Sequence, residues 1–150
     1  MRERNLKLAI AESCTGGLVG HRITNVPGAS AYFLGGVIAY ANEIKLAVLG
    51  VRPETLEKDG AVSAETALEM AQGVRRLTGA DIGVAITGIA GPEGGSLEKP
   101  VGLTWIGIYA PDVSRAWRYL WSGERLAVKE QSAEQVLRLV IAYLRGQLPE

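Results

Sequence analysis

The sequence predicts an α/β fold: a three-layer α/β/α sandwich on a mixed, mostly parallel sheet of about five strands, with an antiparallel edge hairpin. Short, almost wholly apolar runs at 6–11 and 82–87 are typical of central parallel strands, which are buried on both faces. They alternate with segments whose apolar residues recur at helical spacing, and this alternation favours a sheet covered by helices. The 150 residues are expected to form one domain, 1–150.

The first half of the chain is predicted to contain two strands and two short helices. In chain order these are a strand over 6–11, a helix over 17–24, a strand over 32–40 and a helix over 43–49. Pro27-Gly28 indicates a turn between the first helix and the second strand. Gly35-Gly36 indicates a bulge or a close backbone approach within that strand. Asn42 is expected to cap the second helix, which Gly50 and Pro53 end.

The second half is predicted to finish the sheet and cover it. Its elements are a helix over 64–78, a strand over 82–87, hairpin strands over 101–109 and 115–121, and an amphipathic helix from about 124 to 145. Ser63 is placed to cap the first of these helices and Gly79 to stop it. The connection 110–114 is short enough for a hairpin, so the last two strands are expected at the sheet edge.

Composition narrows the class of protein. Lys and Arg number 16 and Asp and Glu also number 16, so no net positive field is available to attract nucleic acid or an anionic membrane. No run approaches the roughly 20 apolar residues of a membrane span. A single cysteine, Cys14, excludes an internal disulfide, and one cysteine with one histidine cannot build a structural zinc site. We therefore expect a cytoplasmic protein that uses no metal and no cofactor.

Polar residues follow the ends of three predicted parallel strands, where ligands of open α/β sheets bind. They are Ser13 and Thr15 after the first strand, Tyr40, Asn42 and Lys45 after the second, and Thr87 with the glycine-rich loop 88–96 after the third. Ser13 precedes Gly16-Gly17 at the mouth of a helix, where free N–H groups can hold an oxyanion or a phosphate. The position is consistent with a nucleophile or with a phosphate cradle.

A serine nucleophile needs a base. The only histidine, His21, is six residues beyond Thr15, roughly 9 Å along a helix, and is expected to point away from Ser13. Lys45 lies between Ile44 and Leu46 and can serve as the base if burial lowers its pKa, although composition alone favours an ordinary surface lysine. Cys14 is a rival nucleophile. Because successive side chains point to opposite faces, only one of the two can face the site, and we favour Ser13.

The glycine-rich loop has no nucleotide-binding signature. It lacks Gly-Lys-Ser/Thr, and no G-x-G-x-x-G follows the first strand, so a nucleoside triphosphate or a dinucleotide is disfavoured. Gly88 and Gly91 either let backbone N–H groups approach a ligand or belong to a flexible crossover.

Five blocks of the sequence resemble, in order, the C-terminal domain of the competence/damage-inducible protein CinA. They are 11–17 (AESCTGG), 36–45 (GVIAYANEIK), 60–63 (GAVS), 87–95 (TGIAGPEGG) and 99–102 (KPVG). Single-domain members of that family are bacterial nicotinamide mononucleotide amidases of the PncC type. Members normally have a helix before the first strand, whereas this sequence reaches the strand soon after Met1. We therefore expect a shortened domain, or one excised from a longer two-domain protein.

The resemblance implies hydrolysis of the carboxamide of nicotinamide mononucleotide to nicotinate mononucleotide and ammonia, a step of pyridine nucleotide recycling (NAD salvage), by a metal-independent hydrolase. By motif, Ser13 is the nucleophile, Lys45 the general base and Tyr40 a hydrogen-bonding assistant to proton transfer. The implied substrate-binding residues are Thr15, Gly16, Gly17, Thr87, Gly88, Gly91 and Arg125. A second arginine usual in the family, four residues after Arg125, is here Lys129, which cannot form the same bidentate fork.

The resemblance also implies a small-molecule pyridine mononucleotide as partner and a homo-oligomer, in the simplest case a dimer. Two other functions stay open at this point. One is a non-catalytic nucleotide-binding or regulatory module of a CinA-like protein, which keeps the pocket without turnover. The other is a hydrolase that depends on Cys14.

Overall fold

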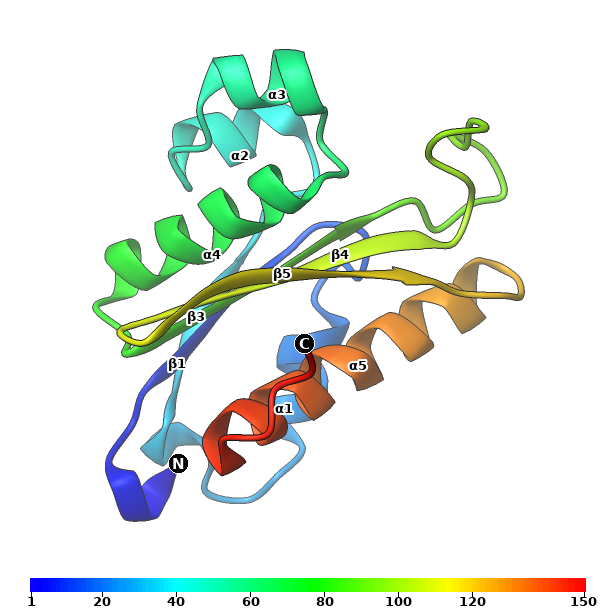
Figure 1. Cartoon of the computed structure of the whole chain (residues 1–150). Helices are drawn as coiled ribbons and strands as arrows, with labels where there is room; N and C mark the ends of the chain where they lie inside the picture. The colour runs from blue at the N-terminus through cyan, green and yellow to red at the C-terminus, as the bar shows by residue number, and fades with distance from the viewer.

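Five strands form a single mixed sheet in the order β2-β1-β3-β4-β5 (Figure 1). The computed structural model describes residues 1–150, except for the side chain of Arg2. The strands are β1 (Leu8–Glu12), β2 (Phe33–Ile38), β3 (Ile82–Gly88), β4 (Leu103–Ala110) and β5 (Val113–Leu120). β1 pairs in parallel with β2 and β3, whereas β3–β4 and β4–β5 are antiparallel. The predicted mixed sheet with an edge hairpin is confirmed.

Helices cover both faces of this sheet and complete the three layers (Figure 1). α1 (Leu18–Thr24) and α5 (Arg125–Arg145) lie on one face, and α2 (Asn42–Ala47), α3 (Pro53–Asp59) and α4 (Ala64–Thr78) lie on the other. Two 3₁₀ turns, Arg2–Arg4 and Ala29–Ala31, precede β1 and β2. No helix in the described part of the chain is long and apolar enough to cross a membrane.

The central strands are buried on both sides, and residue size differs between the two faces. Leu8 and Ile10 belong to the apolar cluster beneath α1 and α5, whereas Ala9 and Ala11 belong to the cluster beneath α4. Small residues let α4 approach the sheet closely. A Cβ on Gly83 of β3 would lie 2.1 Å from the carbonyl oxygen of Ala71 in α4, so only glycine fits there.

Three local differences from the predicted elements have clear causes. Asn42 is the first residue of α2 rather than its cap, because the extended Ala41 occupies the cap position and no side chain caps the helix. α3 was not predicted because Pro53 was interpreted as a helix stop, whereas it opens α3 at a position that proline tolerates. The hairpin turn is tighter than expected, since the ladder continues to the Ala110–Val113 pair.

The cap of α4 is confirmed. Ser63 has an extended backbone and its Oγ accepts a hydrogen bond from the Thr66 amide at 3.1 Å, and Gly79 closes the helix in the left-handed conformation with φ 70°. A well-capped α4 gives α3 a firm surface to pack on.

We predict that Gly73→Ala destabilises the fold. In a helix this change normally gains about 1 kcal/mol. Here the new Cβ would lie 1.9 Å from the carbonyl oxygen of Leu49, just after α2, so we expect the free energy of unfolding to fall by about 1–3 kcal/mol. Urea denaturation measures it. Gln72→Ala, exposed on the same helix, is the matched control and should change stability by less than about 0.5 kcal/mol. A stabilised Gly73→Ala variant would contradict this packing.

Candidate active site

Ser13 lies at the edge of the sheet where three parallel strands end together. Glu12, the last residue of β1, is in register with Ile38 of β2 and with Ile86 of β3. Just beyond, the Ser13 amide donates to the Ile86 carbonyl at 3.0 Å, and the Ala39 amide donates to the Glu12 carbonyl at 2.8 Å. The backbone of Ser13 is therefore fixed from both sides, and its side chain is buried.

Lys45 reaches Ser13 from α2 and is fully enclosed, with 1% of the residue exposed. Its Nζ donates to Ser13 Oγ at 3.1 Å and to the carbonyl oxygens of Ala39 at 2.9 Å and Tyr40 at 3.2 Å. Helical side chains lean toward the N-terminus of their helix, which explains how Lys45 reaches back to the two carbonyls before α2. Among the described residues it forms no ion pair with a carboxylate.

Burial changes the acidity of this ammonium group. Desolvation lowers the pKa of Lys45 below its ordinary value of 10.5, and the weaker charge effects of Cys14 and Glu43 act in the opposite direction. A neutral amine at this place can donate its two hydrogens to the Ala39 and Tyr40 carbonyls. Its lone pair is then left to face the hydroxyl of Ser13. This arrangement can act as a general base.

A cavity of about 180 Å³ opens onto the pair. Its lining comes from the ends of β1, β2 and β3, from α2, from the connection between α3 and α4, and from the start of α5. The lining residues are Ser13, Cys14, Tyr40, Asn42, Lys45, Ala61, Val62, Thr87, Gly88, Ala90 and Arg125. Thr87 donates its hydroxyl hydrogen to the Ala61 carbonyl at 2.7 Å. At Gly88 a Cβ would lie 2.5 Å from Thr104 Cγ2, so a side chain has no room.

Arg125 bridges two parts of the cavity rim. Its guanidinium donates to the carbonyl oxygen of Gly91 at 2.8 Å and to the phenol oxygen of Tyr40 at 2.9 Å. Tyr40 therefore makes two separate contacts. Its carbonyl oxygen accepts from Lys45, and the phenol oxygen of its largely exposed side chain accepts from Arg125. Gly91 supports Arg125 and does not itself line the cavity of Ser13. Lys129 lies one turn further along α5, with Nζ 3.9 Å from the place of a Cβ on Gly16.

Three expected substrate-binding residues, Thr15, Gly16 and Gly17, use polar groups inside the fold, and substrate contact by them stays a prediction. The buried Glu12 carboxylate accepts the hydroxyl of Thr15 at 2.6 Å and the Gly17 amide at 3.1 Å. The Gly16 amide donates to the Ser13 carbonyl at 3.1 Å. None of the three lines the cavity of Ser13. They shape the turn. Within the described turn 13–17, the Cys14 and Thr15 amides are the two that donate to no other residue.

The phosphate-cradle interpretation of this turn is excluded by the same carboxylate. Glu12 also accepts the Val19 amide at 3.1 Å and the Gly20 amide at 2.8 Å, so it fills the N-terminus of α1 with an internal anion. Gly17, with φ 106°, takes the left-handed cap conformation that brings the chain round this carboxylate.

The other candidate groups are placed away from the reaction or are unreactive. His21 is exposed and its ring contacts the amide of Asn25, not Ser13. Cys14 packs into the apolar cluster beneath α1 and α5, and burial raises the pKa of its thiol to about 12. Since the thiolate is the reactive form, Cys14 is a poor nucleophile at neutral pH. No group of three or more potential ligands that could hold a metal ion occurs among the described residues.

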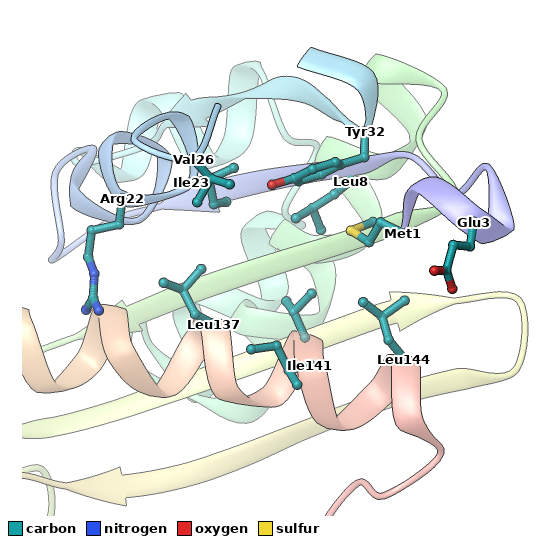
Figure 2. Close-up of a pocket in the computed structure, with 11 residues that line it drawn as sticks. Met1, Glu3, Leu8, Arg22, Ile23, Val26, Tyr32, Leu137, Ile141 and Leu144 are labelled. Carbon is teal, nitrogen blue, oxygen red and sulfur yellow. The ribbon is translucent and has the colours of Figure 1, made fainter. Parts of the chain in front are cut away.

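A larger cavity lies elsewhere, between α1 and α5. It is a mainly apolar groove of about 570 Å³. Figure 2 shows that Leu137, Ile141 and Leu144 of α5 face Ile23, Val26 and Tyr32 across it. Neither Ser13 nor Lys45 contributes to it. The largest of the described cavities is therefore not the one that contains the serine–lysine pair.

Sequence reasoning missed Glu12, Ala61 and Val62. Glu12 directly follows four apolar strand residues, so its carboxylate is expected to be buried and to need several hydrogen-bond donors. This position is the signal in the sequence that points to Glu12. Ala61 and Val62 line the cavity only because α3 and α4 return the chain to the sheet edge, and no local pattern reveals that.

The fold and this site define an α/β domain that presents a buried serine–lysine pair at the carboxyl ends of parallel strands. Comparisons with known proteins agree on the family. The profile of the CinA C-terminal domain matches residues 1–144. A CinA-like protein of Thermotoga maritima is 49% identical over 146 residues, which cover 97% of this chain and 36% of that protein. One of Thermosynechococcus vestitus is 56% identical over 128 residues, 83% of this chain and 30% of that protein.

Solved structures agree as well. The crystal structure of the competence damage-inducible protein A (ComA) of Klebsiella pneumoniae superposes with a TM-score of 0.92 at 33% identity, covering 96% of this chain and 89% of that one. The chain belongs to the CinA C-terminal domain family. It spans about a third of the length of the curated relatives it matches.

We predict a pH-dependent stability that can be traced to Lys45. At low pH both folded and unfolded chains carry the ammonium, and the folded state bears the full cost of burying it. Between the lowered pKa and 10.5 the folded state loses its proton first, so wild-type stability rises with pH. Urea unfolding of wild type and Lys45→Met measures this effect. From pH 7 to 10, the free energy of unfolding of wild type should increase relative to that of Lys45→Met. The exposed Lys58→Met is the control, and an equally flat difference for Lys45→Met would show that burial does not perturb this amine.

Proposed function

We propose that this domain hydrolyses the carboxamide of nicotinamide mononucleotide, giving nicotinate mononucleotide and ammonia. The observation that carries the proposal is the 3.1 Å contact between Ser13 Oγ and the buried Nζ of Lys45 at the base of a cavity. Family membership agrees with it, since the motif AESCTGG places a serine here and the segment after β2 supplies the lysine.

In the first half-reaction, neutral Lys45 takes the hydroxyl proton as Ser13 Oγ attacks the carboxamide carbon. The new C–O bond gives a tetrahedral intermediate with a negatively charged oxygen. Lys45, now an ammonium, returns its proton to the nitrogen of the substrate. The C–N bond then breaks, ammonia leaves and an acyl-serine remains.

In the second half-reaction, water replaces ammonia. Lys45 removes a proton from the attacking water, the second tetrahedral intermediate collapses, and the proton returns to Ser13 Oγ as the acid is released. The sum is amide plus water to carboxylic acid plus ammonia, with no redox change and no further co-reactant.

The oxyanion is assigned to the turn that follows Ser13. The Ser13 amide is committed to Ile86, and the amides of Gly16 and Gly17 are committed to Ser13 and Glu12. The Cys14 and Thr15 amides are therefore the donors proposed to hold it. Removal of one such donor costs about 10²–10³ in turnover in other enzymes.

Cavity dimensions support a substrate with two unequal parts. The 180 Å³ space at Ser13 is below the 300–1,000 Å³ of usual ligand pockets and suits a single aromatic carboxamide. A second cavity of about 510 Å³ adjoins it through Ala90 and Arg125 and lies at the N-terminus of α5. We assign the ribosyl phosphate to that space, where the dipole of α5 and the guanidinium of Arg125 favour an anion.

Replacement of either member of the pair should abolish the reaction while the fold is retained. We expect Ser13→Ala to reduce ammonia release from nicotinamide mononucleotide to background, and Lys45→Met to reduce kcat by about 10²–10⁴-fold. A coupled ammonia assay measures both, with circular dichroism as the folding check. The solvent-exposed Lys58→Ala should retain full activity. Calorimetric binding of the mononucleotide by wild type without ammonia release would instead favour a non-catalytic binding module.

The pH dependence should follow Lys45. Because only the neutral amine can take the serine proton, kcat/KM should increase with pH, up to tenfold per unit, and level off once Lys45 is neutral. The lowered pKa of Lys45 places this rise below the ordinary value of 10.5. Cys14→Ser should keep both the activity and the profile, since the Cys14 thiol stays protonated up to about pH 12. A profile without an acidic limb, or an inactive Cys14→Ser, would refute the assignment.

A further inference from the structure

Glu12 is the one carboxylate enclosed next to the nucleophile, and no step of the proposed reaction uses it. It is 2% exposed and accepts four hydrogen bonds. Oε2 receives the Thr15 hydroxyl and the Gly17 and Val19 amides, and Oε1 receives the Gly20 amide. In the described chain it has no cationic partner.

These donors lie within and directly after the turn that contains the proposed oxyanion amides. Thr15 is in the turn, whereas Gly17, Val19 and Gly20 form the cap and first residues of α1. One rigid carboxylate, anchored at the end of β1, therefore ties the turn to the helix and to the strand. The orientation of the Cys14 and Thr15 amides depends on this connection, since neither has another residue as partner.

We propose that Glu12 is a positioning residue for catalysis: its carboxylate fixes the Ser13–Gly17 turn so that the Ser13 hydroxyl meets Lys45 and the adjacent amides face the oxyanion. This role rests on the function proposed above, because it presupposes that Ser13 is the nucleophile. It is separate from the placement of the base, since Lys45 is held by the Ala39 and Tyr40 carbonyls without any contact to Glu12.

Because Glu12 contacts the turn and not the other walls of the cavity, its loss should change one kinetic constant more than the other. Thr87, Gly88 and Arg125 line the cavity from other elements, so substrate affinity should not depend on Glu12. Loss of the carboxylate should misplace the nucleophile and the oxyanion donors, which act in the transition state. The effect should therefore appear in kcat rather than in KM.

Glu12→Gln is the direct test, because it keeps the shape and replaces one acceptor oxygen with an NH₂ donor. Whichever way the amide is turned, at least one backbone N–H then faces a donor. The matched control is Glu69→Gln in α4, whose carboxylate likewise accepts from a backbone amide, that of Arg52, and from a threonine hydroxyl, that of Thr55, away from the cavity. Both variants are expected to unfold at lower temperature than wild type.

The decisive readout is the rate at which a small alkyl fluorophosphonate labels Ser13, followed by intact mass. In this reaction Ser13 Oγ forms a bond to phosphorus, fluoride leaves, and Lys45 takes the proton. We expect Glu12→Gln to label about 10²–10³-fold more slowly than wild type, and kcat for the amide to fall equally with KM changed less than threefold. Glu69→Gln should label within threefold of wild type.

Each other outcome decides the matter. A folded Glu12→Gln that labels at the wild-type rate would overturn the positioning role, and so would one whose KM rises while its kcat is unchanged. If Glu12→Gln does not fold, Thr15→Val, which removes a single buried hydroxyl donor, takes its place; we expect about tenfold slower labelling, and an unchanged rate refutes the proposal. Wild type that labels but releases no ammonia from the mononucleotide would contradict the proposed substrate alone. Wild type that does not label would contradict both proposals.

Discussion

The end of the sheet that carries Ser13 is organised around one buried side chain, the carboxylate of Glu12. A carboxylate enclosed in protein is costly unless its lone pairs are filled, and here the Thr15 hydroxyl and the first amides of α1 fill them. The helix N-terminus that could have bound an external phosphate is thereby satisfied from within. The consequence is a rigid turn directly after β1, and Ser13 stands at its start. The same interaction uses the Thr15 hydroxyl and the Gly17 amide inside the fold, so these two groups support the turn.

The complementary constraint is the burial of Lys45. Parallel pairing places the ends of β2 and β1 side by side, and α2 turns back so that the lysine spans the gap between them. The two carbonyls that receive its hydrogens are neutral, so they satisfy the amine without stabilising its charge as a carboxylate would. Desolvation then lowers the pKa of Lys45. The tightly packed face beneath α4 contributes indirectly, because Gly73 lets α4 approach the backbone of Leu49 and so holds α2 in place.

The two cavities differ in size and in the side chains that line them, and the larger one lacks a candidate nucleophile. The groove between α1 and α5 is the larger, but its lining is mainly apolar and lacks a nucleophile (Figure 2). The smaller space is lined by Ser13 and Lys45, the proposed nucleophile and base, and Arg125 connects it to a second space at the start of α5. Arg125 also joins the end of β2 to the loop after β3, through Tyr40 and Gly91, so the rim is assembled from three distant parts of the sequence.

The sequence alone determined the layered α/β class, the capped α4 and the position of Ser13 after the first strand. These follow from local patterns, since apolar runs, helical spacing and cap residues act over a few neighbours. It also supplied Lys45 as a candidate base, but composition alone favoured an ordinary surface lysine. Only the tertiary structure decided that Lys45 is enclosed against Ser13, that Tyr40 holds it through a carbonyl, and that Glu12 fills the end of α1. Each of these depends on strand order and burial, which bring together groups that no local pattern relates.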